Sequence, residues 1–375
     1  MTTNQPAQHA RTWGLGLAVV AVGLALALNA ASFLAAWASN RAYLRLDALL
    51  NQAQGRISLQ AASQAADWPA LPAAGSARFV TAYGQGLAAM GLRHYPEAVT
   101  AFQAALAADP QFSGTHALLG DAYYATGDAS QAVPEWQAGQ ALPLLLARGE
   151  TSGRTGDWTA AINWCRLATQ VDPQSAAAFQ QLGQAYGAAG QRPAQIEALK
   201  IAVSLAPGDM QIRHVLGLAY WQQGDAAAAA TQFEQVLAAE PDDFYTNLYL
   251  AGIELSLGQL DAAETYARKT TQLSSTNPRT HFALGSVLAR RAQWPAAIDA
   301  LKKAVDLIEP WNRQADTPLS KTDQINYRLA LAQAYHSGGQ SALAITAYQS
   351  VLKLDPKNAA ASAALSALTA PGQPE

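Results

Sequence analysis

The stretch LGQAY at 182–186 recurs as LGLAY at 216–220, 34 residues further along the chain. Related pairs belong to the same series: Leu119-Gly120, Leu284-Gly285 and Leu331-Ala332. About a dozen residues after such a pair comes an Ala, followed four residues later by an aromatic: Ala98 with Phe102, Ala132 with Trp136, Ala229 with Phe233, and Ala344 with Tyr348. Most units close on a proline, at Pro110, Pro173, Pro207, Pro241 and Pro356. Self-similarity at a fixed period predicts a stack of short units rather than a globule.

This pattern resembles the tetratricopeptide repeat family, whose 34-residue signature has a Leu-Gly pair, a Tyr, an Ala, an aromatic and a terminal Pro. The resemblance implies an all-α, right-handed helical solenoid of about eight helix-turn-helix units. Alignment on the signature positions predicts an array over 79–358, with units at 79–112, 113–141, 142–175, 176–209, 210–243, 244–277, 278–311 and 325–358. A capping helix is expected over 359–369 and a disordered tail over 370–375.

Each signature position has a physical role in this prediction. The glycines sit where a Cβ would hold two helices of one unit apart, namely Gly120, Gly183, Gly217 and Gly285. The aromatic residues are expected to fill the space between units. Gly-Asp pairs such as Gly224-Asp225 are expected to form the turn, because Gly leaves helical geometry easily and Asp caps the next helix.

Some repeats depart from the signature. The third carries Ser152 and Cys165, and the sixth carries Glu254 and Ala267, where bulkier or aromatic residues are usual. Units three and six are therefore predicted to be the most irregular. The inserted residues near 310–324 are predicted to form a polar loop.

An uncharged stretch runs from Trp13 to Trp37 near the start of the chain. Twenty-five helical residues would span roughly 37 Å, more than the ~30 Å hydrocarbon core of a membrane. We expect a transmembrane signal anchor over 13–38, between an N-terminal tail over 1–12 and a partly helical linker over 39–78. A cleavable signal peptide ending near Ala38 would instead make the protein secreted, and a buried core helix is a third reading.

Two opposing arguments bear on the side of the membrane on which the repeat array lies. Arg41 and Arg45 after the span favour a cytoplasmic C-terminal part under the positive-inside rule. A short tail before one span more often translocates the domain that follows. We expect a single-pass protein of a bacterial-type membrane, with the array outside the cytoplasm.

Composition excludes several classes of function. Net charge is −3 and 14% of residues are charged, so no basic field would hold a nucleic acid. The single cysteine, Cys165, excludes a disulfide framework, and its helix-packing position predicts a buried side chain. The six histidines are scattered, and Asp243 is expected to cap a helix, with a metal site at Asp242-Asp243 as the alternative. We expect no cofactor, no metal and no enzymatic activity.

The resemblance implies that the first helix of each unit lines a concave groove. The side chains transferred to that groove as partner-binding candidates are Tyr83, Tyr124, His214, Leu218, Trp221, Tyr245, Leu248, Arg279 and Phe282. They lack the Lys/Asn/Arg set with which chaperone-binding members hold a C-terminal carboxylate. We hypothesise an apolar stripe that binds a peptide or helix of a partner protein; the alternative is that these side chains bury one another.

The expected function is a membrane-anchored scaffold or adaptor for protein–protein interaction. A regulatory or assembly subunit of an envelope biogenesis complex is the alternative, and cleavage near Ala38 would give a secreted binding protein. Homo-oligomerisation stays open.

Overall fold

The computed structural model describes residues 75–369, so the membrane helix predicted over 13–38 and the tail predicted over 370–375 lie outside the described residues. All regular structure within 75–369 is α-helical, as predicted, and that range contains no strand. None of the helices in that range is both long and apolar enough to span a lipid bilayer.

The helices form two compact units, Met1–Ala185 and Tyr186–Glu375, whose boundary falls within α11 (Ala176–Ala188). The described helices before α11 are α5 (Gly75–Leu92), α6 (Tyr95–Ala108), α7 (Ser113–Ala125), α8 (Ala129–Ala138), α9 (Leu142–Arg154) and α10 (Trp158–Val171). Those after it are α12 (Arg192–Leu205), α13 (Met210–Gln223), α14 (Ala226–Ala239), α15 (Phe244–Leu257), α16 (Leu260–Leu273), α17 (Pro278–Arg290), α18 (Trp294–Asp306), α19 (Ile308–Gln314), α20 (Lys321–Ser337), α21 (Ser341–Leu354) and α22 (Ala359–Thr369).

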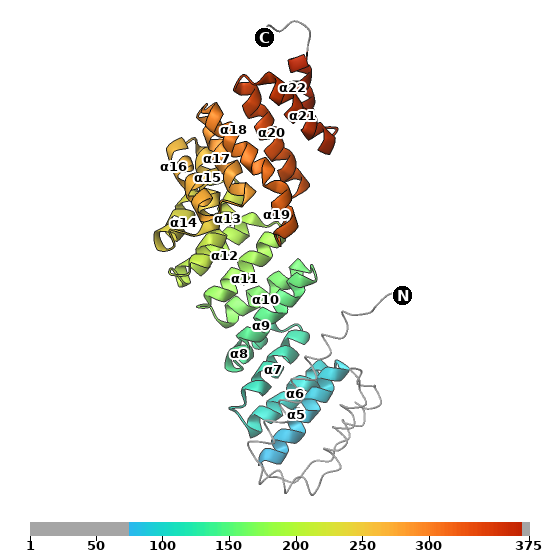
Figure 1. Ribbon diagram of the computed structural model, residues 1–375. Coiled ribbons are helices and arrows are strands. Elements are labelled where there is room, and N and C mark those ends of the chain that lie inside the picture. The colour runs from blue at the N-terminus through green and yellow to red at the C-terminus, as the bar shows by residue number, and fades with distance from the viewer. Residues whose placement is uncertain (1–74, 370–375) are drawn as a thin grey trace. The chain divides into compact units, whose positions relative to one another are not determined.

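Helices that follow one another in sequence pack side by side within each unit (Figure 1). In the second unit α13 packs on α14, α14 on α15, and the series continues in the same way to α18. The starts predicted for the first and last repeats, residues 79 and 325, each lie four residues after the start of the helix in the structure. Helix α5 starts at Gly75 and α20 at Lys321. Ser320 and Asp323 explain the second difference, since they form a capping box at the start of α20.

The two helices of a repeat approach closely through one recurring contact. A Cβ added to Gly120 would lie 2.6 Å from the indole of Trp136, which is sixteen residues later in the paired helix. The same spacing brings a small first-helix residue against the second helix in five repeats: Gly86 with Phe102, Gly120 with Trp136, Gly149 with Cys165, Gly217 with Phe233, and Gly285 with Leu301. We call this the small–large contact. It confirms the predicted role of Gly120, Gly217 and Gly285.

The large residues of these contacts also join one repeat to the next. Phe102 is fully buried in a cluster with Leu119 of the following repeat, and Trp136 shares a cluster with Leu145. Each aromatic ring therefore covers the small residue of its own repeat and contributes to the interface with its neighbour.

The turns inside the repeats have the predicted geometry. Gly127, Gly156 and Gly224 adopt φ values of +90°, +81° and +90°, a left-handed region that costs glycine little. The aspartate after each glycine caps the next helix. Asp225, for example, accepts a hydrogen bond from the Ala228 backbone N–H at 3.0 Å.

The prediction that repeats three and six are irregular was wrong. Helices α9, α10, α15 and α16 run without interruption. Close approach survives in both repeats because the side chains facing each other are small. Gly149 meets Cys165 in the third repeat, and Ala251 and Ala267 share one buried cluster in the sixth.

The prediction of a polar loop at 310–324 was also wrong. The short helix α19 begins at Ile308 and takes in the first five of these residues, and Ile308 and Leu319 are buried in one cluster with Tyr327. Apolar side chains in the insertion therefore dock it onto the array, and α18 still packs directly on α20.

A matched pair of substitutions tests the small–large contact. We expect Gly217→Ala to lower the free energy of unfolding by about 1–2 kcal/mol, because the new Cβ would lie 2.9 Å from the Phe233 ring. Gly252→Ala, in the middle of α15, should raise it by about 0.5–1 kcal/mol, since a Cβ there meets nothing within 4 Å and alanine favours helix. Chemical denaturation of both variants measures the difference. Equal changes in the two variants would contradict the role of Gly217.

Candidate functional site

The nine predicted partner-binding residues all lie on first helices of repeats. Tyr83 on α5 and Tyr124 on α7 belong to the first unit. The other seven belong to the second unit: His214, Leu218 and Trp221 on α13, Tyr245 and Leu248 on α15, and Arg279 and Phe282 on α17. Their surroundings divide them into packed side chains and accessible ones.

Tyr83 is used for packing. Its ring lies 5.4 Å from that of Phe79, 5.9 Å from Phe112 and 6.1 Å from Phe102, measured between ring centroids. Burial raises the pKa of Tyr83 to about 12. The side chain therefore stays neutral and helps close the first repeat.

Tyr124 is part of a polar and aromatic cluster. Its ring centroid lies 4.8 Å from that of Trp164 on α10. Arg148 on α9 lies over the same Trp164 ring at 5.1 Å and donates two hydrogen bonds, of 2.7 and 2.6 Å, to the carboxylate of Asp121. Trp136 Nε1 donates to Asp121 as well, at 3.0 Å. The carboxylate thus ties three helices together.

Arg148 and Trp164 were not predicted as neighbours of Tyr124. In the sequence, Arg148 stands before Gly149 in the third repeat, at the position where other repeats carry the leucine of the Leu-Gly pair. Its pairing with Asp121 of the preceding repeat explains that departure. A bidentate arginine–carboxylate pair fixes the orientation of both groups.

His214 is half-buried and packed. Its Nδ1 lies 2.9 Å from Oγ1 of Thr246, and its ring stands edge-on to Phe233 at 5.2 Å between centroids. Burial lowers the pKa of His214 below its usual value, and the carboxylate of Asp243 opposes this only in part. A neutral imidazole is therefore favoured at neutral pH.

Leu218 and Trp221 on α13 are partly buried. Both pack against a cluster that contains Phe233 of α14 together with Leu250 and Ile253 of α15. They lie beside α15 without being fully covered by it.

An uncharged row of residues runs along α15, with Tyr245 and Gly252 exposed and with Leu248 and Leu255 half-buried. It consists of Tyr245, Leu248, Gly252 and Leu255, which lie at helical spacing on one face. Tyr245 is 62% exposed, and its ring stands edge-on to that of Phe244, at 5.3 Å between ring centroids. Gly252 is exposed and open, since a Cβ there would meet no atom within 4 Å. We call these four residues the α15 row.

Phe282 and Arg279 on α17 meet residues of the insertion and of α20. The ring of Phe282 stacks on that of Tyr327, with 4.1 Å between centroids and 13° between planes. The guanidinium of Arg279 lies 6.0 Å from the centre of the Trp311 ring. Phe282 is thus committed to packing, a role that its repeat position did not predict.

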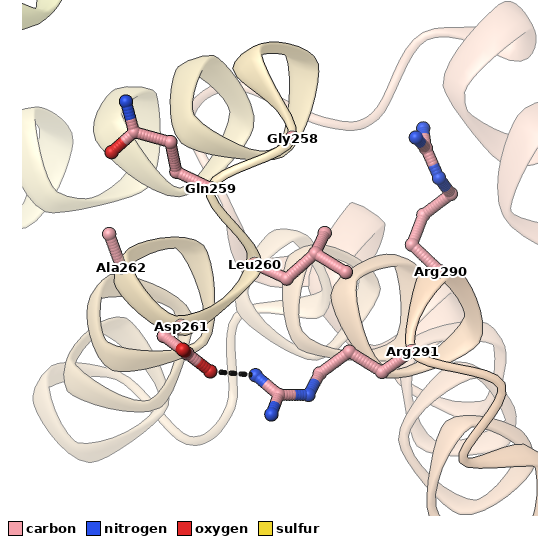
Figure 2. A pocket seen from close by; sticks show the side chains of 7 residues that line it. All are labelled: Gly258, Gln259, Leu260, Asp261, Ala262, Arg290 and Arg291. Atoms are coloured by element: carbon pink, nitrogen blue, oxygen red, sulfur yellow. Dashed lines mark hydrogen bonds and ion pairs between the residues drawn. The ribbon is translucent and has the colours of Figure 1, made fainter.

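The described residues also form an open pocket of about 810 Å³ (Figure 2). It is lined by Gly258, Gln259, Leu260, Asp261, Ala262, Arg290 and Arg291. Arg291 points to Asp261 and forms an ion pair of 2.5 Å, with Glu264 at 3.4 Å. None of the nine predicted residues lines this pocket, which lies where helices turn rather than on the α15 row.

The side chains that the sequence offered as metal ligands or as a reactive thiol have structural roles, namely Asp242, Asp243 and Cys165. Asp243 caps α15 by accepting from the Thr246 N–H at 2.7 Å, as predicted, and Asp242 pairs with Lys269. Cys165 is buried, as predicted, and burial raises its pKa to about 11, so the thiol stays protonated at neutral pH. Across residues 75–369 no three His, Cys, Asp or Glu side chains are grouped to hold a metal ion.

Comparison with sequence families gives matches over four ranges. A family model described as tetratricopeptide repeat matches residues 83–143, 181–234 and 214–278, and a second with the same description matches 325–358. Together these ranges cover just over half of the chain. No curated protein matches the chain significantly in sequence.

Several solved structures are similar to the chain. PilW, described as a widely conserved type IV pilus biogenesis factor, is 17% identical with a TM-score of 0.50, over 60% of this chain and 99% of PilW. MamA from Desulfovibrio magneticus RS-1 is 21% identical with a TM-score of 0.43, over 49% of this chain and 97% of that chain. A chain of the APC/C hetero-tetramer Cut9–Hcn1 is 17% identical with a TM-score of 0.47, over 83% of this chain and 59% of that chain. The likeness to PilW shows a shared helical fold.

The packed and accessible members of the predicted site should respond differently to truncation. We expect Phe282→Ala to lower the free energy of unfolding by about 3 kcal/mol, because it removes a ring stacked on Tyr327. Tyr245→Ala should change it by no more than about 0.5 kcal/mol, since that ring is mostly exposed. Denaturant unfolding followed by circular dichroism measures both. A large loss for Tyr245→Ala would show that it, too, is a packing residue.

Proposed function

Since this chain belongs to the tetratricopeptide-repeat proteins, we propose that it is a docking scaffold that binds a segment of a partner protein along the α15 row. Members of this fold act in protein–protein interaction and assembly. The observation that carries the proposal is the uncharged face of α15, on which Tyr245 is exposed and Gly252 is open.

The chemistry of the α15 row suits an apolar partner segment. Tyr245 offers a large ring with a polar tip, and aromatic residues of this kind are common anchors of protein interfaces. Leu248 and Leu255 add apolar area, while Gly252 leaves room for a side chain of the partner. An amphipathic helix that places its apolar face on this row matches a common mode of peptide recognition.

Leu218 and Trp221 extend the proposed surface onto α13, where their partly buried side chains flank α15. Phe282, Tyr83 and Tyr124 are left out of it because their rings are engaged with neighbouring rings. The proposal is one of binding rather than catalysis, in agreement with the buried, protonated Cys165.

We also propose that the scaffold is anchored in a membrane by residues 13–38 and that the repeats lie outside the cytoplasm. The uncharged run from Trp13 to Trp37 supports the anchor. An assembly role in a membrane complex is compatible with such an anchor. The likeness to PilW concerns the fold and does not transfer pilus biogenesis to this chain.

A photo-crosslinking amino acid at position 245 tests the docking surface in cells. We expect one dominant covalent partner, which mass spectrometry identifies and which is then titrated as a purified fragment. Replacing Tyr245 and Leu248 together by Ser should weaken binding at least about tenfold, because the anchoring ring and its apolar neighbour are lost. The matched control is Leu343→Ser on α21, which also removes an exposed apolar side chain, 49% exposed. Equal losses in the two variants would overturn the proposed surface.

Fractionation and a C-terminal reporter test the anchor. The chain should stay in the membrane pellet after alkaline carbonate extraction, and deletion of residues 13–38 should release it. A fused phosphatase should be active, because that enzyme matures only outside the cytoplasm. A mature N-terminus near Ala38 would instead identify a cleaved signal peptide, and an inactive phosphatase would reverse the proposed orientation.

A further inference from the structure

Glu254 occupies a buried position at which four of the other repeats carry a tyrosine. The tyrosines that follow the Leu-Gly or Leu-Ala pair of the other repeats at this position are Tyr123, Tyr186, Tyr220 and Tyr335. Glu254 lies on α15 with only 3% of its surface exposed. The sixth repeat therefore places a carboxyl group inside the helix stack.

One oxygen of the Glu254 carboxyl lacks a hydrogen-bond partner. Its Oε2 is buried and makes no hydrogen bond. The two cations nearest along the chain are engaged elsewhere, since Arg268 pairs with Glu264 at 2.7 Å and Lys269 pairs with Asp242. A buried polar group without a partner is unfavourable, and an ionised one is more so.

The titratable neighbours make ionisation harder. Helix α14 contributes Glu234, whose negative charge opposes a second one on Glu254, and α16 contributes the neutral phenol of Tyr266. Burial, and then Glu234, raise the pKa of Glu254 above that of an exposed glutamate. Burial together with Glu234 and Glu254 likewise raises the pKa of Tyr266.

We propose that Glu254 makes the packing of α14, α15 and α16 dependent on pH: the neutral carboxyl is compatible with the packed helices, and its ionisation opens their contact. The opening is local, because each repeat is stabilised mainly by its immediate neighbours. This inference concerns the stability of the stack and does not rest on the docking function.

The direction of the effect follows from the raised pKa. Between the value for an unfolded glutamate, about 4.3, and the higher native value, the folded chain binds more protons than the unfolded one. The stability contributed by the neutral carboxyl is fully present below that window. It is lost as the pH rises through the native pKa.

Thermal unfolding of the full chain in mild detergent, measured from pH 4.5 to pH 8, tests the proposal. Glu254→Gln keeps the shape of the side chain and cannot ionise. We expect this variant to gain about 2–6 °C in unfolding midpoint over the natural chain at pH 8 and to lose most of that advantage at pH 4.5. Hydrogen–deuterium exchange at pH 8 should show slower exchange in α14, α15 and α16 of the variant than of the natural chain.

The control is Glu240→Gln, which neutralises an exposed glutamate at the end of α14 and should leave the pH profile unchanged. Glu234→Gln gives a second route should the Glu254→Gln variant fail to fold, and it should reduce the loss at high pH in part. Identical pH profiles for the natural chain and Glu254→Gln would overturn the proposal. So would a loss of exchange protection spread evenly over all repeats.

Discussion

The small–large contact between the two helices of a repeat is the constraint on which the rest of the structure depends. A glycine such as Gly86 or Gly217 lets the ring sixteen residues later lie against the backbone of the first helix. The same ring then contributes to the interface with the next repeat, as Phe102 does with Leu119. Since a repeat buries its faces only against its neighbours, each local contact of this kind also sets the position of the following helix pair.

The contact tolerates different residues as long as the two sides remain complementary in size. Cys165 opposite Gly149, and Ala251 with Ala267, let the two helices approach closely in the repeats that depart from the sequence signature. Glu254 is a different kind of departure, because it changes polarity rather than size. Glu254 therefore places an ionisable group inside a stack that depends on apolar packing.

The sequence predicted which residues lie on the first helices of the repeats, but it did not predict which of their side chains are accessible to a partner. The repeat pattern assigns both Tyr245 and Phe282 to the groove, as aromatic residues near the start of a first helix. Tyr245 is 62% exposed, whereas Phe282 stacks on Tyr327 at 4.1 Å. The covering ring comes from α20, which follows the insertion, so the repeat period contains no information about it.

The sequence by itself determined the all-α fold, the repeat period, the role of Gly120, Gly217 and Gly285 in the small–large contact, and the Gly-Asp turns. These features rest on interactions between residues close in sequence, where the 34-residue period and capping chemistry are sufficient. Only the tertiary structure decided that Trp311 and Tyr327 cover α17, that Arg148 pairs with Asp121, and that Oε2 of Glu254 is buried without a hydrogen bond. Exposure and pairing depend on atoms supplied by other helices, and their positions depend on the packing of the helices between them.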